Sequence, residues 1–326
     1  MTSDDSFHPR DKSRPFVAMQ ARSLDGGRTW QVDETPCRTP GGRSLSADEH
    51  VLPEHQLSTA LDQEDGIRPP PDGIDFAHPD FALMCARTGL TAGARSWFYA
   101  STDRCRSWQG PYALPSFDQS GIAARTDYVV EGPSSCLLFL TAAKPNGDEG
   151  RVFCARTEDG GKSFGFVDWV TPEPAGYAIM PASVRLPGGR LLCAVRYRGS
   201  RSDGPNAACW IDLFTADDGG AKWRLLARPV ADTGFGGNPP TLTRLADGRL
   251  CITYGFRAEP FGIRAVISED DGQSWGAPIV LRADGGNHDL GYPRTVQRPD
   301  GKLVTVYYFN DRPDGERYIG ATLWDV

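Results

Sequence analysis

Seven arginines fall in segments that we expect to join β-strands at one face of the fold. They are Arg125, Arg151, Arg196, Arg198, Arg257, Arg264 and Arg294. The chain as a whole has a net charge of −7, so this cluster does not reflect a basic composition. A guanidinium binds a carboxylate through two parallel hydrogen bonds. The cluster therefore predicts a site for an anionic ligand.

The same segments contain side chains that can move protons or attack a substrate. Asp127 and Glu149 are carboxylates, Tyr292 is a phenol, and Asn238 is a further polar candidate for substrate binding. Carboxylates serve as general acids and bases, and a phenol can act as a nucleophile. Each residue also has a structural interpretation: an arginine can form an inter-strand ion pair, Asp127 can cap a turn, and Tyr292 can be packing.

A motif of the form Ser/Thr-x-Asp-x-Gly-x-x-Trp/Phe recurs along the chain. Clear copies begin at Ser23, Thr157 and Ser268, and weaker copies begin at Ser101 and Ala216. Asp and Ser/Thr side chains bond nearby backbone N–H groups, and glycine adopts a positive φ without steric cost. Each copy follows an apolar or alternating run, so each predicts a strand, a stapled turn and a second strand.

A second repeat alternates with the first. The segments 185–196, 244–254 and 298–307 each contain a glycine turn between two apolar runs, which is typical of a hairpin. One hairpin of each kind makes a four-stranded unit, and such repeated units favour one large domain.

The start of the chain departs from this pattern. Residues 1–15 form a polar tail, and a single domain is expected over 16–326 with a long Pro/Gly-rich loop near 35–75. The first unit lacks a recognisable first hairpin. We therefore expect an N-terminal unit that is incomplete, because of irregular closure or a missing start.

The five motif copies resemble the Asp boxes, or BNR repeats, of sialidases in the neuraminidase superfamily. This resemblance covers most of the chain after residue 15. It implies an all-β, six-bladed β-propeller of the sialidase type, with the sugar site on the face opposite the Asp boxes.

The resemblance also implies roles for individual residues. In sialidases an arginine triad grips the substrate carboxylate, a tyrosine activated by a glutamate is the nucleophile, and an aspartate is the acid/base. By position, Arg125, Arg196 and Arg257 match the triad. Tyr292 matches the nucleophile, Glu149 its partner carboxylate, and Asp127 the acid/base.

The function expected from these residues is hydrolysis of a terminal acidic sugar, as in an exo-sialidase. The N-terminal Phe/Tyr-Arg-Ile-Pro signature of sialidases is absent from this sequence. Two alternatives therefore stay open: a non-catalytic carbohydrate-binding propeller, and a sugar lyase or epimerase on the same fold.

Composition limits the other possibilities. An acidic pI near 5.3 argues against nucleic acid as the partner, and the chain has no long apolar run that predicts a membrane span. The polar start lacks the apolar region of a signal peptide, so a cytoplasmic protein is expected. The eight cysteines show no zinc-ligand spacing, and several lie in apolar strands, so we expect buried free thiols with no metal and no cofactor. The sequence leaves the oligomeric state open.

Overall fold

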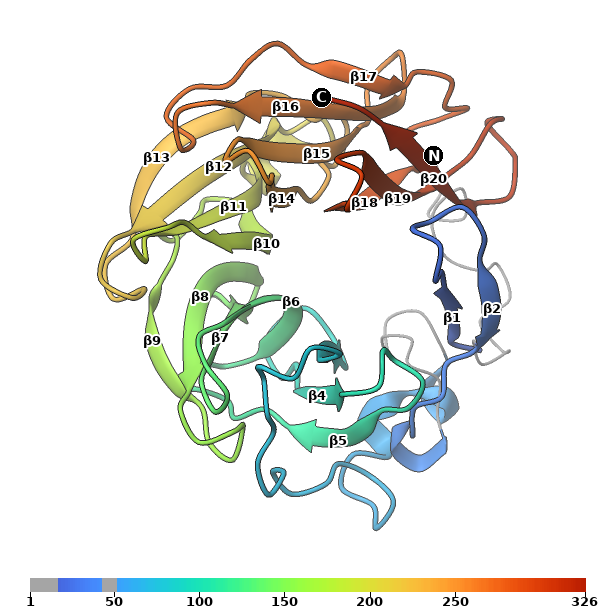
Figure 1. The fold of residues 1–326 in the computed structure, drawn as a ribbon. Helices are drawn as coiled ribbons and strands as arrows, with labels where there is room; N and C mark the ends of the chain where they lie inside the picture. Colours follow the sequence, from blue (N-terminus) through green and yellow to red (C-terminus); the bar gives the residue numbers. More distant parts are fainter. Residues whose placement is uncertain (1–16, 43–51) are drawn as a thin grey trace. The chain divides into compact units, whose positions relative to one another are not determined.

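The computed structural model describes residues 17–42 and 52–326, apart from the side chains of residues 57 and 201, and its regular secondary structure is almost entirely antiparallel β-strand (Figure 1). The predicted polar tail lies outside the described residues. The chain divides into two compact units, which are described separately. Among the described residues, the N-terminal unit contains 17–22, 30–42 and 52–167, and the C-terminal unit contains 23–29 and 168–326.

The described residues of the N-terminal unit form three sheets. The first consists of β1 (Met19–Arg22) and β2 (Gln31–Glu34). The second has the order β3 (Ala82–Arg87), β4 (Ser96–Ser101), β5 (Gln109–Ala113). The third has the order β6 (Ile122–Val130), β7 (Cys136–Ala143), β8 (Glu149–Thr157), β9 (Gly165–Trp169), with β9 ending just beyond the unit.

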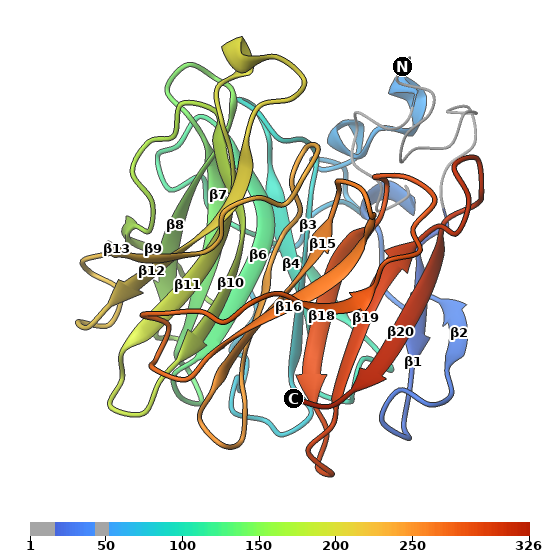
Figure 2. The same cartoon turned by 90° about the horizontal axis from the view of Figure 1, so that it is seen from above.

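Three more sheets lie in the part of the C-terminal unit that the structure describes. The first has the order β10 (Tyr177–Arg185), β11 (Leu191–Arg198), β12 (Cys209–Ala216), β13 (Arg224–Val230). The second has the order β14 (Thr241–Arg244), β15 (Leu250–Phe256), β16 (Gly262–Ser268), β17 (Ile279–Arg282). The third has the order β18 (Gly291–Gln297), β19 (Leu303–Phe309), β20 (Tyr318–Trp324), and its strands lie side by side in Figure 2.

Five of these sheets have three or four strands and correspond to five blades, so the prediction of six blades is wrong. The physical reason lies after the first hairpin. In the described part of the segment between β2 and β3, the chain forms short 3-10 turns at Pro40–Gly42, Pro53–His55 and Leu57–Thr59, and no further strand pairs with β1 or β2. The first sheet therefore stops at two strands.

The repeated motif forms the expected turns, with Asp side chains that bond to the backbone. In the copy that joins β16 to β17, Asp270 Oδ1 accepts hydrogen bonds from Ser268 Oγ at 2.8 Å and from the Ser274 N–H at 2.9 Å. The copy that joins β12 to β13 has Ala216 in the first position, yet Asp218 Oδ1 still accepts from two backbone N–H groups. The local sequence thus closes each of these hairpins.

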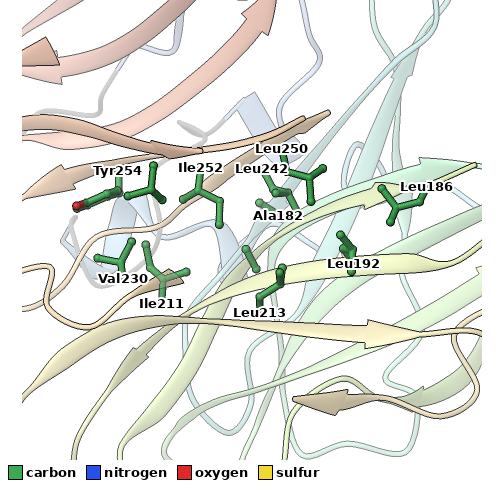
Figure 3. Packing of buried hydrophobic residues seen from close by; sticks show 12 residues of the cluster. Ala182, Leu186, Leu192, Ile211, Leu213, Val230, Leu242, Leu250, Ile252 and Tyr254 are labelled. Atoms are coloured by element: carbon green, nitrogen blue, oxygen red, sulfur yellow. The ribbon is translucent and has the colours of Figure 1, made fainter. Parts of the chain in front are cut away.

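Apolar side chains of adjacent sheets make the core of the C-terminal unit. Ile211 and Leu213 of β12 and Leu250 and Ile252 of β15 are fully buried in one cluster, and Figure 3 shows them between the two sheets. Further buried side chains, including Leu303 and the indole of Trp324, join the second sheet to the third. All eight cysteines are free, as expected, and five of them are buried.

No helix among the described residues is long and apolar enough to cross a membrane.

Candidate functional site

Four of the predicted site residues come together in the C-terminal unit. Arg196 lies in β11, Asn238 precedes β14, Arg257 follows β15, and Tyr292 lies at the start of β18. Hydrogen bonds or a ring contact connect Tyr292 with each of the other three. These contacts define the candidate site.

Arg196 is almost completely buried, with 6% of its surface exposed. Its Nη2 donates to Tyr177 Oη at 3.0 Å and to the carbonyl of Gly236. Its Nη1 faces Met180 Sδ at 3.3 Å and Tyr292 Oη at 3.4 Å. A thioether is a weak acceptor, and the 3.4 Å contact to Tyr292 is long for a hydrogen bond, so a carboxylate oxygen at Nη1 would be a stronger acceptor than either neighbour.

Two residues that face Arg196 adopt an unusual backbone conformation. Met180 has φ +55° and Tyr292 has φ +51°, and each precedes a proline where the strand pairing shifts register. A positive φ is uncommon for bulky side chains, and a bulge re-aims the side chain that it carries. Such strained positions concentrate at functional sites. In this site both of them direct a side chain to one guanidinium.

Arg257 belongs to a buried chain of polar groups. Its Nη2 donates to Tyr308 Oη at 2.6 Å, and Tyr308 donates in turn to Asp289 Oδ1 at 2.9 Å. Asp289 Oδ2 accepts from Arg317 Nε at 2.7 Å. Asp289 is fully buried between these two donors, so its charge is compensated within the protein.

The guanidinium of Arg257 also lies over the ring of Tyr292, 5.7 Å from its centroid. Tyr292 is 39% exposed, whereas the two arginines beside it are buried. A phenol accessible to solvent is thus held next to two fixed positive charges. Phe235, which is 40% exposed, pairs its N–H with the carbonyl of Arg257 and packs edge-on against His288.

The pKa values of two groups in the site are shifted by burial. Burial raises the pKa of the Tyr308 phenol above its ordinary value, although Arg257 opposes this shift. Burial, assisted by the charge of Arg257, lowers the pKa of His288. Tyr308 is therefore held as a neutral phenol.

Three other predicted arginines of this unit have separate environments. Arg198 Nη2 lies 3.3 Å from the carbonyl of Gly204. The guanidinium of Arg264 stacks on the ring of Phe256 at 3.4 Å from its centroid. Arg294 is exposed on β18.

The remaining predicted residues lie in the N-terminal unit. Arg125 Nη1 and Glu149 Oε1 form an ion pair of 2.6 Å, in which both side chains are largely buried. Asp127 lies on β6 opposite Phe139, and Arg151 lies on β8 opposite Ala142. A pocket of about 460 Å³ in this unit is lined by the loop 88–94 and contains none of them.

Four residues of this network were not predicted as site residues from the sequence: Tyr177, Tyr308, Asp289 and Arg317. The hairpin repeat could have indicated Tyr308, because it pairs Gly291 of β18 with Tyr308 of β19. That register places Tyr308 beside the segment 289–292. No group of three or more His, Cys, Asp or Glu side chains in the described ranges is arranged to hold a metal ion.

Comparison with solved structures shows the fold class. A protein of unknown function from Dyadobacter fermentans is similar at 23% identity and a TM-score of 0.62, covering 80% of this chain and 77% of that one. A thermostable family-43 glycoside hydrolase is similar at 16% identity and a TM-score of 0.52, covering 78% of this chain and 89% of that one. A Hadza microbial sialidase is similar at 14% identity and a TM-score of 0.55, covering 82% of this chain and 57% of that one.

These likenesses and the sheet topology define an all-β protein of the β-propeller class, whose fold is shared with glycoside hydrolases. No family model matches the chain. No curated protein matches it either.

Proposed function

We propose that this protein is a glycoside hydrolase that cleaves a terminal acidic sugar, as an exo-sialidase does. The observation that carries the proposal is the placement of Tyr292, which is partly exposed, beside the buried guanidinium groups of Arg196 and Arg257. The propeller fold, shared with a family-43 glycoside hydrolase and a sialidase, supports it at the level of architecture.

In this proposal Arg196 receives the substrate carboxylate. Its Nη2 is held by Tyr177 and Gly236, which fixes the guanidinium plane. Its Nη1 faces the thioether of Met180 and the phenol of Tyr292, and a carboxylate oxygen is a much stronger acceptor than either. Binding of a sugar acid thus replaces weak contacts of Arg196 Nη1 with a charge-assisted hydrogen bond to the substrate carboxylate.

Tyr292 is the nucleophile in this proposal. Tyrosine nucleophiles are an established exception to the two-carboxylate rule of glycosidases. The two adjacent guanidinium groups favour the phenolate that attacks the anomeric carbon. Tyr308 is less suited to this role, because it is more deeply buried and donates its hydrogen to Asp289. Asp127 as acid/base and Glu149 as partner carboxylate remain proposals to be tested by substitution.

The decisive experiment is hydrolysis of aryl glycosides of a sialic acid, a uronic acid and neutral sugars by the wild type, Arg196→Lys and Tyr292→Phe. Lysine keeps the charge of Arg196 but not its planar fork. Turnover of an acidic sugar that both variants lose supports the proposal. Turnover restricted to neutral sugars, or unchanged rates in both variants, contradicts it.

A non-catalytic carbohydrate-binding propeller is the second candidate. It is favoured by Asp289, whose two carboxylate oxygens are already bound by Tyr308 and Arg317 and whose side chain is fully buried. This carboxylate is positioned to stabilise the fold rather than to transfer a proton. Binding of a sugar acid by calorimetry, without release of the aryl group, would select this function.

A further inference from the structure

The side chain of Asn238 is enclosed by backbone rather than open to a ligand. It is 0% exposed, and its amide forms hydrogen bonds with the main chain of Gly255, Leu290 and Tyr292. Glycines surround it: a Cβ on Gly291 would lie 2.2 Å from Asn238 Nδ2, and a Cβ on Gly255 would lie 2.8 Å from its Cγ. The chain around Asn238 is therefore shaped to fit this one side chain.

The hydrogen bonds of Asn238 connect its own segment to two others of the site, those of Gly255 and Tyr292. Its Oδ1 accepts from the N–H groups of Gly255 and Tyr292, each at 3.0 Å. Its Nδ2 donates at 3.0 Å to the carbonyl of Leu290, which also accepts from Arg257 Nε at 3.0 Å. Both lone pairs of the amide oxygen are thus used within the protein.

We infer that Asn238 is a positioning residue, which holds Tyr292 in its left-handed backbone conformation and so keeps the phenol beside Arg196 and Arg257. A tyrosine at φ +51° needs its surroundings to fix it, because that conformation is disfavoured for a bulky side chain. The bond from the Tyr292 N–H to Asn238 is a direct constraint of this kind. The inference rests on the proposed function only for the effect of Asn238 on turnover.

The first test follows the Tyr292 N–H itself and needs no substrate. Amide hydrogen exchange is measured by NMR in the wild type, Asn238→Ala, Asn238→Asp and Thr253→Val. Alanine removes the acceptor, so exchange at Tyr292 should rise about tenfold, the equivalent of losing one net hydrogen bond. Aspartate keeps the acceptor oxygen for the Tyr292 N–H but loses the donation to the Leu290 carbonyl, so exchange at Tyr292 should rise less than in Asn238→Ala.

Thr253→Val is the matched control. Thr253 is fully buried and bonds Thr295 Oγ1 at 2.7 Å, so the variant also removes a buried bond between β15 and β18 without touching Tyr292. Exchange at Tyr292 that stays unchanged in Asn238→Ala, or rises equally in Thr253→Val, overturns the inference. Should Asn238→Ala fail to fold, Asn238→Ser takes its place in each comparison.

The second test uses hydrolysis of the aryl glycoside that the wild type turns over. Misplacing a reacting group by about 1 Å costs roughly 100-fold in rate, so Asn238→Ala should lower kcat by about that factor with little change in KM. The kcat of Asn238→Asp should be higher than that of Asn238→Ala, and Thr253→Val should keep a kcat close to the wild-type value. Rapid exchange at Tyr292 with unchanged kcat and KM overturns the inference. If the wild type hydrolyses no glycoside, the proposed function fails and the exchange comparison alone decides.

Discussion

Tyr308 donates its phenolic hydrogen to Asp289 across 2.9 Å, and Asp289 is fully buried. Burial raises the pKa of Tyr308, so this phenol stays neutral and its carboxylate partner stays occupied. The pair also fixes the position of Arg257, because Tyr308 Oη accepts a hydrogen bond from Arg257 Nη2. Tyr292 is more exposed and is therefore the phenol of this site that can contact a ligand.

The first prediction concerns the buried guanidinium of Arg196. Arg196→Lys should lower kcat/KM on an acidic aryl glycoside by about 100- to 1,000-fold, the range observed when one preorganised donor is removed. Arg190→Ala is the control, because Arg190 is paired with Asp271 at a turn outside the candidate site. Equal losses in the two variants would indicate general damage rather than a substrate contact.

The second prediction concerns Asp127, whose role as acid/base was expected from the sequence. Asp127→Asn is isosteric and removes the titrating group, so hydrolysis should slow by about 100-fold or more. Asp72→Asn, at an exposed position of the same unit, should leave the rate unchanged. A wild-type rate in Asp127→Asn would exclude Asp127 from proton transfer.

The third prediction concerns the core between the first two sheets of the C-terminal unit. Leu213 is fully buried there, so Leu213→Ala should lower the free energy of unfolding by about 2–5 kcal/mol. Leu225 on neighbouring β13 is 56% exposed, and Leu225→Ala should change stability much less. Urea unfolding followed by tryptophan fluorescence measures both, and similar midpoints would contradict the packing described.

The fourth prediction concerns the acid sensitivity of the turns. The side-chain hydrogen bond from Ser274, together with backbone N–H bonds, lowers the pKa of Asp270 to about 2. An unfolded aspartate titrates near pH ~3.9, so the stabilisation by Asp270 is present above that pH and is lost as the pH falls toward about 2. Asp270→Asn should reduce the dependence of the urea midpoint on pH between about pH 4 and 2. An unchanged pH dependence in the variant would show that the turn does not depend on the charge.

The fifth prediction concerns His288, which faces Arg257, Asp289 and Arg317 and packs against Phe235. Burial and Arg257 lower its pKa in the folded state, so below about pH 6.5 the unfolded chain binds the proton more readily than the folded one. Stability should therefore fall as the pH drops from 7 to 5. His288→Gln should reduce that fall, and an identical pH profile in the variant would exclude His288 as its cause.

The sequence by itself determined the local structure of this protein. The Ser/Thr-x-Asp motif closes its turns through bonds that span two to four residues, such as those between Asp270 and Ser274, and the glycine turns set the register of the adjoining hairpins. Short-range bonds of this kind depend on residue type and spacing alone. The sequence also marked Arg196, Arg257 and Tyr292 as candidates.

Only the tertiary structure decided which candidates meet. Arg196 and Tyr292 are 96 residues apart, and Asn238 and Tyr292 are 54 apart, so their contacts depend on the packing of three sheets. The number of blades also depended on pairing beyond the hairpins, and there the prediction of six was wrong. A strand pattern predicts that a residue lies at the end of a strand, but the long-range packing of sheets decides which side chain lies opposite it.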